Sequence, residues 1–579
     1  MRKLLVQKNN SIPNLWKFIL CIEILLWLPL ILIGFDSHHD GLILTNVNLL
    51  NESFKSAGPW PFNQYGPFWI LPYSFLTYFL PNDITLLALR VVTVGCYYLT
   101  SYFIYLAAKI IAGRKLAFIA VLVFFFSQPF LTNYGSNLVP WPSAIVMPIT
   151  SLIFLLTLKI YAEFISKTKI FIISFSIGIL ISTVSFSRVQ IGFLLLLANT
   201  LFGIFTRKNQ STFFIILGFI SGSTAILFFL DWHGWVIDAL NDQFIFGSTY
   251  LRGDTSSYPY PVFTFIATMF FLFLIVLAPK IKLLFSGRIN FQLLMFINIL
   301  IIFFILFWLS QSREISILNA FVILYRRFWM SLFLAIIIYS VFSQTRKTLT
   351  VIQKKEKLEK DLIIRNCLVI FSLVSEAQVF PLFDQMHFWW GSAPAVILVI
   401  LISKDRLFNN HHNFIYLKHL HYSIIMLMTL ALIPTISFFQ ESYSRYPKSI
   451  ANFIYVSKDQ SIYELNLQSY FSASIKKDSK VLNLCADSNV FFNMENNFKS
   501  ASRNYVFWLS MYEVDSLYNA ILSSKPNYIV TCSLNRIPAL QEKSEALQSN
   551  ILKKTFPTAI QISTFADKLD MIWRIYKLP

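Results

Sequence analysis

Long apolar runs alternate with short polar connections over roughly the first 440 residues of the chain. Most runs are close to the ~20 residues that a helix needs to cross a bilayer, or somewhat shorter. Beyond them the sequence becomes polar and Tyr-rich, and then shows strand-like runs at 481–484 and 528–531. The pattern predicts a polytopic α-helical membrane module over 1–440 and a small α/β domain over 441–579. About thirteen spans are expected, at 14–34, 84–111, 116–131, 143–164, 170–187, 189–206, 211–230, 262–279, 289–309, 321–342, 364–380, 391–403 and 421–438.

Lysine and arginine fall in alternate connections of this module, which indicates a common cytoplasmic side. Because the number of spans is odd, the C-terminal domain is expected on the opposite, extracytoplasmic side. The distribution predicts a multi-pass protein of a bacterial inner (cytoplasmic) membrane with a cytoplasmic N-terminus. The outer connections would be 35–83, 132–142, 231–261, 310–320 and 381–390.

Composition supports the membrane assignment and limits the other classes. The 579 residues are 56% hydrophobic and only 13% charged, which is more apolar surface than a soluble domain can bury. The net charge of +19 is explained by basic cytoplasmic loops that meet anionic lipid, and nucleic acid is not an expected partner. No zinc-type cysteine spacing, phosphate-binding loop or dinucleotide fingerprint occurs. Cys485 and Cys532 end the two strand-like runs, and the sequence leaves their pairing open.

The first outer connection, residues 35–83, opens with a dense group of ionisable side chains. A continuation of the first helix by one turn would place Asp36 and Asp40 on one face, with His39 beside them. A carboxylate pair at a membrane surface suits proton abstraction from a hydroxyl group, or binding of a divalent cation. The alternative is a polar loop that caps a helix and contacts lipid headgroups. The stretch is Phe35-Asp36-Ser37-His38-His39-Asp40-Gly41.

Arginines also occur on the predicted outer side, where positive charge is disfavoured. Arg188 lies in a tight turn between two apolar runs, and Arg326 and Arg327 lie at the outer start of a later span. An arginine at membrane depth is costly and normally has a partner. Such arginines suit the capture of a lipid-linked phosphate. The alternative is an ion pair with an outer acid such as Asp36 or Glu314.

A late outer segment combines polar and aromatic side chains. It runs from Glu376 to Trp390 and includes Gln378, Asp384 and His387. These groups offer hydrogen bonds and stacking to a sugar or its phosphate. The alternative is a helix end broken by proline and flanked by an aromatic belt. The connection 231–261, with four aspartates and several tyrosines, is a weaker candidate for sugar binding.

These pieces resemble the GT-C superfamily of membrane glycosyltransferases. That superfamily combines many transmembrane helices with essential acids just after the first helix, and often with a soluble C-terminal domain. The resemblance covers the whole chain in architecture but only four segments in motif: Asp36 through Gly41, Tyr65-Gly66-Pro67, Ser187-Arg188-Val189-Gln190, and Gln378 through Trp390. It implies a hexosyl- or pentosyltransferase that takes a sugar from a polyprenyl-phosphate donor. The sugar would pass, with inversion, to a glycan, lipid or protein acceptor outside the cytoplasm.

The resemblance also implies roles for single residues. Asp40 is favoured as the base and Asp36 as its partner or as a cation ligand, although the reverse assignment is open. Arg188, with Arg326 or Arg327, would hold the donor phosphate. No cofactor is certain; a divalent cation, Mg or Mn, on Asp36 and Asp40 is the one candidate. The expected substrate-binding set is His38, His39, Tyr65, Arg188, Gln190, Arg326, Arg327, Gln378, Asp384 and His387.

Two other functions compete with this one. A surface-polysaccharide polymerase or ligase would also use outer arginines, but its chemistry is expected in a large late loop, and the late loops here are short. A lipid-linked sugar flippase or transporter would be expected to carry an internal repeat and ionisable residues near mid-bilayer, and no repeat is evident.

Overall fold

We describe a computed structural model of the chain. The residues described are 21, 25, 28, 30–35, 39–61, 63, 65–81, 84–127, 138–162, 166–246, 264–273, 276, 317–354, 359–379, 385–407, 443–445, 453–485, 498–503, 519, 521–533, 538–566 and 571–579. The predicted spans at 289–309 and 421–438 lie outside these ranges. Most of the first span does too.

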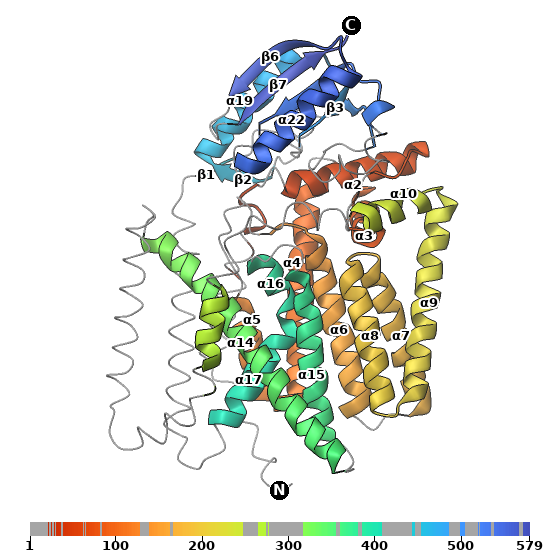
Figure 1. The fold of residues 1–579 in the computed structure, drawn as a ribbon, viewed down its shortest axis with the longest axis vertical. Coiled ribbons are helices and arrows are strands. Elements are labelled where there is room, and N and C mark those ends of the chain that lie inside the picture. Colours follow the sequence, from red (N-terminus) through yellow and green to blue (C-terminus); the bar gives the residue numbers. More distant parts are fainter. Residues whose placement is uncertain are drawn as a thin grey trace.

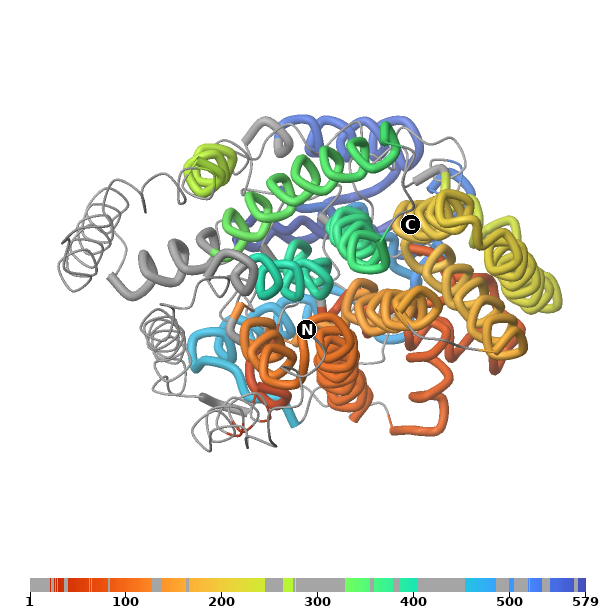
Figure 2. Tube along the Cα trace, turned by 90° about the horizontal axis from the view of Figure 1, so that it is seen from below, coloured from red at the N-terminus to blue at the C-terminus, as the bar shows by residue number. Residues whose placement is uncertain are grey.

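The apolar runs form a helical bundle. Four described helices are long and apolar enough to cross a membrane: α4 (Thr85–Ala112), α6 (Pro142–Ala162), α7 (Lys167–Ser185) and α9 (Asn209–Trp232). Several further helices correspond to predicted spans. They are α5 (Arg114–Phe126), α8 (Val189–Phe205), α14 (Ile317–Gln353), α15 (Lys360–Glu376) and α17 (Ala393–Leu407). Seen end-on, α6 lies between α9 on one side and α15 on the other (Figure 2).

Small residues allow the closest helix packing in the bundle. A Cβ atom on Gly178 of α7 would lie 2.1 Å from the carbonyl oxygen of Ile215 in α9. A Cβ atom on Gly218 of α9 would meet the carbonyl oxygen of Phe175 at the same distance. Glycine at such crossings lets two membrane helices approach along their backbones. The outward faces of α8 and α9 expose large apolar side chains such as Phe193, as contact with lipid requires.

Short helices cover one end of the bundle (Figure 1). They are α2 (His39–Ser56), α3 (Pro67–Thr77), α10 (Val236–Asn241), the π-helix η3 (Asp242–Phe246), the 3-10 helix η5 (Ala377–Val379) and α16 (Gln385–Gly391). Helix α3 lies in the first outer connection. Its Trp69 and Tyr73 are buried against the protein, while its Phe75, and Phe79 just beyond its end, are exposed.

The first helix does not run on toward Asp40, so the expected shared helical face of Asp36 and Asp40 is wrong. The chain turns at Ile31, and Ile33 forms a parallel β-bridge with Tyr455. Gly34 then adopts a φ of 78°, a left-handed conformation that favours glycine. A new helix, α2, begins at His39. Residues 36–38 lie outside the described part of the chain.

Residues 453–579 contain a five-stranded sheet with the order β4-β3-β5-β7-β6. The central strands β3 and β5 are parallel, and β7 pairs antiparallel with both β5 and β6. The strands are β3 (Ser479–Asn483), β4 (Phe498–Ser500), β5 (Tyr528–Cys532), β6 (Ile560–Ala566) and β7 (Ile572–Lys577). The helices are α19 (Lys458–Ser474) and α22 (Pro538–Thr555). Cys485 and Cys532 form a disulfide with their Cα atoms 5.6 Å apart, at the ends of the parallel strands.

The sheet-containing part sits on the end of the bundle that carries α2, α3 and α10 (Figure 1). Strand β2 (Tyr455–Ser457), which pairs with β1 (Tyr443–Arg445), makes one junction. There the Gly34 N–H donates to the Tyr455 carbonyl over 2.7 Å, and the Tyr455 N–H donates to the Leu32 carbonyl over 2.6 Å. The second junction is an ion pair: Arg503 binds both carboxylate oxygens of Asp242, at 2.8 and 2.9 Å.

Candidate active site

Asp40 is held in a buried ion pair at the start of α2. Its Oδ2 accepts a 2.7 Å hydrogen bond from Nη2 of Arg90, and both side chains have no exposed surface. Arg90 reaches this position from the second turn of α4 and also donates to the carbonyl oxygens of Ile31 and Gly34, at 3.1 and 2.7 Å. Arg90 thus holds both the backbone that precedes α2 and Asp40 in the first turn of α2. Burial of two charges is costly, and their mutual attraction and the added hydrogen bonds offset that cost.

Asp40 therefore pairs with a residue that the sequence analysis did not place in the site. Arg90 was not expected in the site, because a lone arginine near the end of a span has several explanations. Its position within an apolar run was nevertheless the available signal. Asp36 and His38 lie outside the described residues. His39 begins α2, and its side chain lies outside them as well.

Arg188 lies at the start of α8 and is 3% exposed. Its Nε and Nη2 both donate to the hydroxyl oxygen of Ser143 in the first turn of α6, at 3.1 and 2.6 Å. Its guanidinium carbon lies 5.1 Å from the centre of the Tyr65 ring, a cation–π distance. The Tyr65 ring meets Trp141 edge to face at 5.1 Å. Arg188 is thus a buried cation surrounded by a hydroxyl group and aromatic rings.

Two predicted motifs, Tyr65-Gly66-Pro67 and Ser187-Arg188-Val189-Gln190, come together at this point. The Phe68 N–H donates to the Phe186 carbonyl over 2.9 Å, which joins the first outer connection to the turn before α8. Gly66 has a φ of 94°, and a Cβ atom there would lie 2.6 Å from the same carbonyl oxygen. Only glycine permits both the conformation and the approach. Gln190 follows in the first turn of α8 and is half-buried.

Asn63 organises the loop behind Tyr65, and sequence reasoning missed it. Its Oδ1 accepts from the Trp69 indole at 2.9 Å, and its Nδ2 donates to the Gly66 carbonyl at 2.8 Å. Its backbone N–H donates to Asp242 Oδ2 at 3.2 Å. Asp242 in turn binds Arg503, so contacts lead from the sheet-containing part to the loop that carries Tyr65. An asparagine among prolines and aromatics was the only local signal, and it is typical of any turn.

Burial affects the ionisation of Asp242. Removal from water raises the pKa of this carboxyl group to about 6, and a nearby carboxylate, Asp238, adds to the effect. Hydrogen bonding and charge attraction from Arg503 oppose the rise. Asp242 is one of the four aspartates of the connection 231–261, and it is buried.

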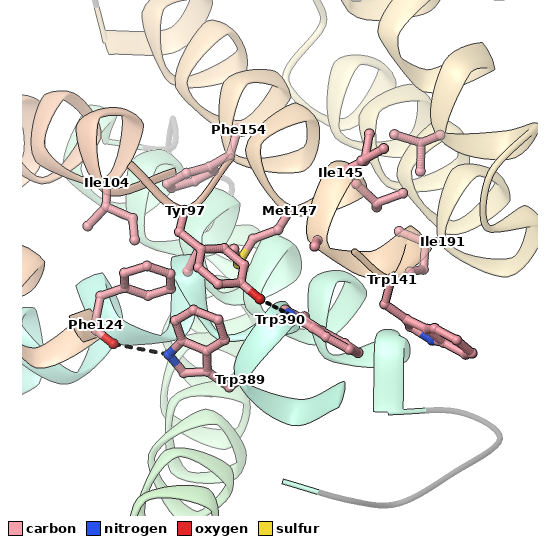
Figure 3. Packing of buried hydrophobic residues seen from close by; sticks show 14 of the residues in the cluster. Tyr97, Ile104, Phe124, Trp141, Ile145, Met147, Phe154, Ile191, Trp389 and Trp390 are labelled. Carbon is pink, nitrogen blue, oxygen red and sulfur yellow. Dashed lines mark hydrogen bonds between the residues drawn. The ribbon is translucent and has the colours of Figure 1, made fainter. Parts of the chain in front are cut away.

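The late outer segment forms a third group at the same end of the bundle. Gln378 in η5 donates to the carbonyl oxygen of Trp390 at 3.1 Å, and the ring centres of His387 and Trp390 lie 5.1 Å apart. Trp390 also approaches the Tyr97 hydroxyl at 3.3 Å (Figure 3). Asp384 lies outside the described residues. Arg326 and Arg327 lie in α14, and their side chains are outside them too.

Glu376, the last residue of α15, begins the late outer segment, but it was not expected in the site. Its side chain is 9% exposed, and neither carboxylate oxygen has a hydrogen-bond partner in the described part of the chain. The available signal was an acid close to the end of a predicted span. Within the described residues, no three His, Cys, Asp or Glu side chains lie close enough together to hold a metal ion.

No known family pattern and no curated protein sequence matches this chain. Its fold is similar to solved structures. An archaeal oligosaccharyltransferase, AglB from Archaeoglobus fulgidus in complex with an inhibitory peptide and a dolichol-phosphate, is 11% identical over 96% of this chain and 74% of its own, with a TM-score of 0.48. ArnT from Cupriavidus metallidurans bound to undecaprenyl phosphate is 10% identical over 98% of both chains, with a TM-score of 0.44.

A further structure of the Archaeoglobus fulgidus oligosaccharyltransferase, in complex with Zn and sulfate, is 12% identical over 88% of this chain and 67% of its own, with a TM-score of 0.45. Likenesses at this level concern the arrangement of elements and assign no role to a residue of this chain.

Proposed function

We propose that the protein is an inverting membrane glycosyltransferase that uses a polyprenyl-phosphate-linked hexose or pentose and acts on a glycan, lipid or protein acceptor. The observation that carries the proposal is the buried site of Arg188. A guanidinium ion, a hydroxyl group and aromatic rings meet there, at the end of an apolar bundle. These groups suit a phosphate whose prenyl chain lies in the membrane.

The topology expected from the charge distribution completes the proposal. It places the N-terminus in the cytoplasm of a bacterium, with about thirteen spans crossing the inner membrane. The first outer connection, the late outer segment and the domain at 441–579 would then share the extracytoplasmic side. The donor lipid would enter between helices beside the first outer connection.

The chemical step then follows from these groups. An acceptor hydroxyl oxygen attacks the anomeric carbon of the sugar from the face opposite the phosphate, and the carbon–oxygen bond to the phosphate breaks. Its electron pair stays on the phosphate, which leaves as polyprenyl phosphate. Arg188 stabilises the negative charge that develops on this leaving group. The hydroxyl proton passes to a carboxylate.

For the base we favour Asp36, the assignment that the sequence left as the alternative to Asp40. Asp40 is fully buried in an ion pair with Arg90, so its carboxylate is closed to an acceptor hydroxyl. Asp40 would therefore fix the start of α2, and the acceptor proton would pass to Asp36. A divalent cation, Mg or Mn, would have Asp36 as its ligand from this stretch.

The test is transfer activity in purified protein supplied with polyprenyl-phosphate sugars. We expect Asp36→Asn to lose at least about a hundredfold in turnover, as removal of a general base does, with no change in thermal stability. Arg188→Ala should weaken use of the donor. Full activity of Asp36→Asn would remove the first connection from the chemistry, and unchanged donor dependence of Arg188→Ala would give that arginine a structural role.

A lipid-linked sugar flippase or transporter is the competing function, and it predicts a different result. A flippase in vesicles would carry the lipid-linked sugar across the bilayer with no acceptor present. A glycosyltransferase would release polyprenyl phosphate only when an acceptor is supplied. Translocation without release would refute the proposal.

A further inference from the structure

Glu376 has an environment that a structural side chain does not usually have. It is the last residue of α15, it is 9% exposed, and both of its carboxylate oxygens lack a hydrogen-bond partner in the described part of the chain. The Gln378 side-chain oxygen, two residues later, is fully buried and is likewise unpartnered there. Three oxygen acceptors thus lie on neighbouring residues without a donor.

Such a group is costly to maintain. A buried polar atom that loses water and gains no partner destabilises the folded state, and a carboxyl group does so more than a neutral one. Two other buried acids in the described residues have an arginine partner: Asp40 binds Arg90, and Asp242 binds Arg503. Unpartnered buried acceptors in a membrane protein therefore indicate a ligand that brings the donors.

Glu376 and Gln378 lie next to the Arg188 site. Helix α8, which Arg188 precedes, packs against both α15 and η5, and α16 packs against α6, where Ser143 binds Arg188. The Trp390 carbonyl accepts from Gln378, and Figure 3 shows the Trp390 ring on the side of Trp141. Trp141 contacts Tyr65, the ring beside Arg188. A sugar attached to a phosphate at Arg188 would therefore lie at the end of the bundle where α15 and η5 carry these acceptors.

We propose that Glu376 and Gln378 form a sub-site for the sugar of the lipid-linked donor and accept hydrogen bonds from its hydroxyl groups. A sugar ring presents several O–H donors, and a carboxylate with two free oxygens can accept from two of them. This inference rests on the proposed function, because it uses the phosphate at Arg188 to place the ring. It assigns Glu376 to recognition of the sugar and Arg188 to recognition of the phosphate.

The test separates the two parts of the ligand. The binding of purified protein to a polyprenyl phosphate is compared with its binding to the same lipid carrying one sugar, for a panel of hexoses and pentoses. We expect wild type to prefer at least one sugar-bearing lipid, and Glu376→Gln to lose that preference by about tenfold, the effect of one hydrogen bond to a charged group. Its affinity for the bare lipid should change less than twofold.

Two variants and a control complete the design. Gln378→Leu should show the same selective loss, to a smaller extent, and Arg188→Ala should weaken the binding of both lipids. Glu542→Gln, at an exposed acid of α22, should alter neither. Equal weakening of both lipids by Glu376→Gln would overturn the sub-site.

The sub-site can also fail while the proposed function stands. If wild type prefers no sugar-bearing lipid over the bare one, there is no sugar sub-site. Loss of bare-lipid binding in Arg188→Ala would then still support the phosphate site. Retained bare-lipid binding in that variant would count against the proposed function itself.

Discussion

Two acids at the same end of the bundle are buried in opposite ways. Asp40, at the start of α2, binds an arginine that also donates to three backbone carbonyl groups. Glu376, at the end of α15, has no partner for either oxygen in the described part of the chain. The first arrangement pairs the buried acid with a cation, whereas the second leaves both carboxylate oxygens without a donor in the described part of the chain. The difference separates an acid that holds the fold from one that is available to a ligand.

The largest effect is expected from Arg90→Ala. The substitution leaves Asp40 buried without its arginine partner and removes the donor to three backbone carbonyl groups. Breaking a buried pair in this way costs about 3–5 kcal/mol of unfolding free energy. Thermal or denaturant unfolding of the detergent-solubilised protein measures it. Arg114→Ala, at the exposed first residue of α5, is the control and should change stability little.

The double variant Arg90→Met with Asp40→Asn should recover much of the lost stability, because it removes both charges together. If Arg90→Ala and Arg114→Ala lowered the unfolding free energy equally little, Asp40 would not be an acid that holds the fold. The contrast between Asp40 and Glu376 would then disappear.

Asp242 provides an intermediate case, because its arginine comes from the sheet-containing part. Arg503 is 17% exposed, so we expect Arg503→Ala to cost about 2–3 kcal/mol at pH 8, less than a fully buried pair. Lys499→Ala, at an exposed lysine of β4, is the control. Equal stability of Arg503→Ala and wild type at pH 8 would show that this ion pair does not join the two parts.

The pH dependence of that cost follows from the pKa of Asp242, which burial raises from 3.8 to about 6. The Asp242 carboxyl group binds a proton more tightly in the folded state than in the unfolded state. Its protonation therefore contributes most to the free energy of unfolding below pH 4, and this contribution is lost as the pH rises to 6. Arg503 lowers the pKa of Asp242, because it stabilises the ionised carboxylate. Arg503→Ala therefore loses most unfolding free energy at a pH where Asp242 is ionised. The cost of Arg503→Ala should therefore shrink at pH 5. A cost that is equal at pH 5 and pH 8 would contradict this.

Glu376→Leu is expected to act in the opposite direction. Leucine has a similar volume and needs no hydrogen bonds, so the variant should gain about 1–2 kcal/mol of unfolding free energy. Unfolding under the conditions used for Arg90→Ala gives the comparison. Loss of stability would mean that Glu376 has a partner in the folded protein, and the distinction between the two acids would fail.

How far the sequence predicts this structure depends on the range of the interactions. The helices α4 and α6 begin and end within two residues of the predicted spans, because apolar composition over about 20 residues is a local property. The strands β3 and β5 were likewise evident from short apolar runs. Helix α19 was missed because the segment is polar, and its helical form depends on packing against β1, β2 and β6.

For the candidate site, the sequence indicated single residues better than it indicated which residues contact one another. Arg188 and Tyr65 were both singled out, but their contact depends on the close approach at Gly66. The pairing of Asp40 with Arg90 spans fifty positions, and the break before α2 depends on a bridge to Tyr455 far along the chain. Pairings of this kind are set by tertiary structure, and no local pattern indicates them.

The smallest effect is expected at Ser143, and it tests the ligand-binding side of the contrast. Its hydroxyl oxygen accepts two hydrogen bonds from Arg188 and so orients the guanidinium group. Ser143→Ala removes that acceptor at a cost of about 1 kcal/mol, which corresponds to roughly fivefold weaker binding of a polyprenyl phosphate. Thr150→Ala, a loss of a buried hydroxyl two turns further along α6, is the matched control and should leave this affinity unchanged. If both variants bind the lipid like wild type, the orientation of Arg188 does not depend on Ser143. The Ser143 contact would then not position the N–H groups of Arg188 for a phosphate.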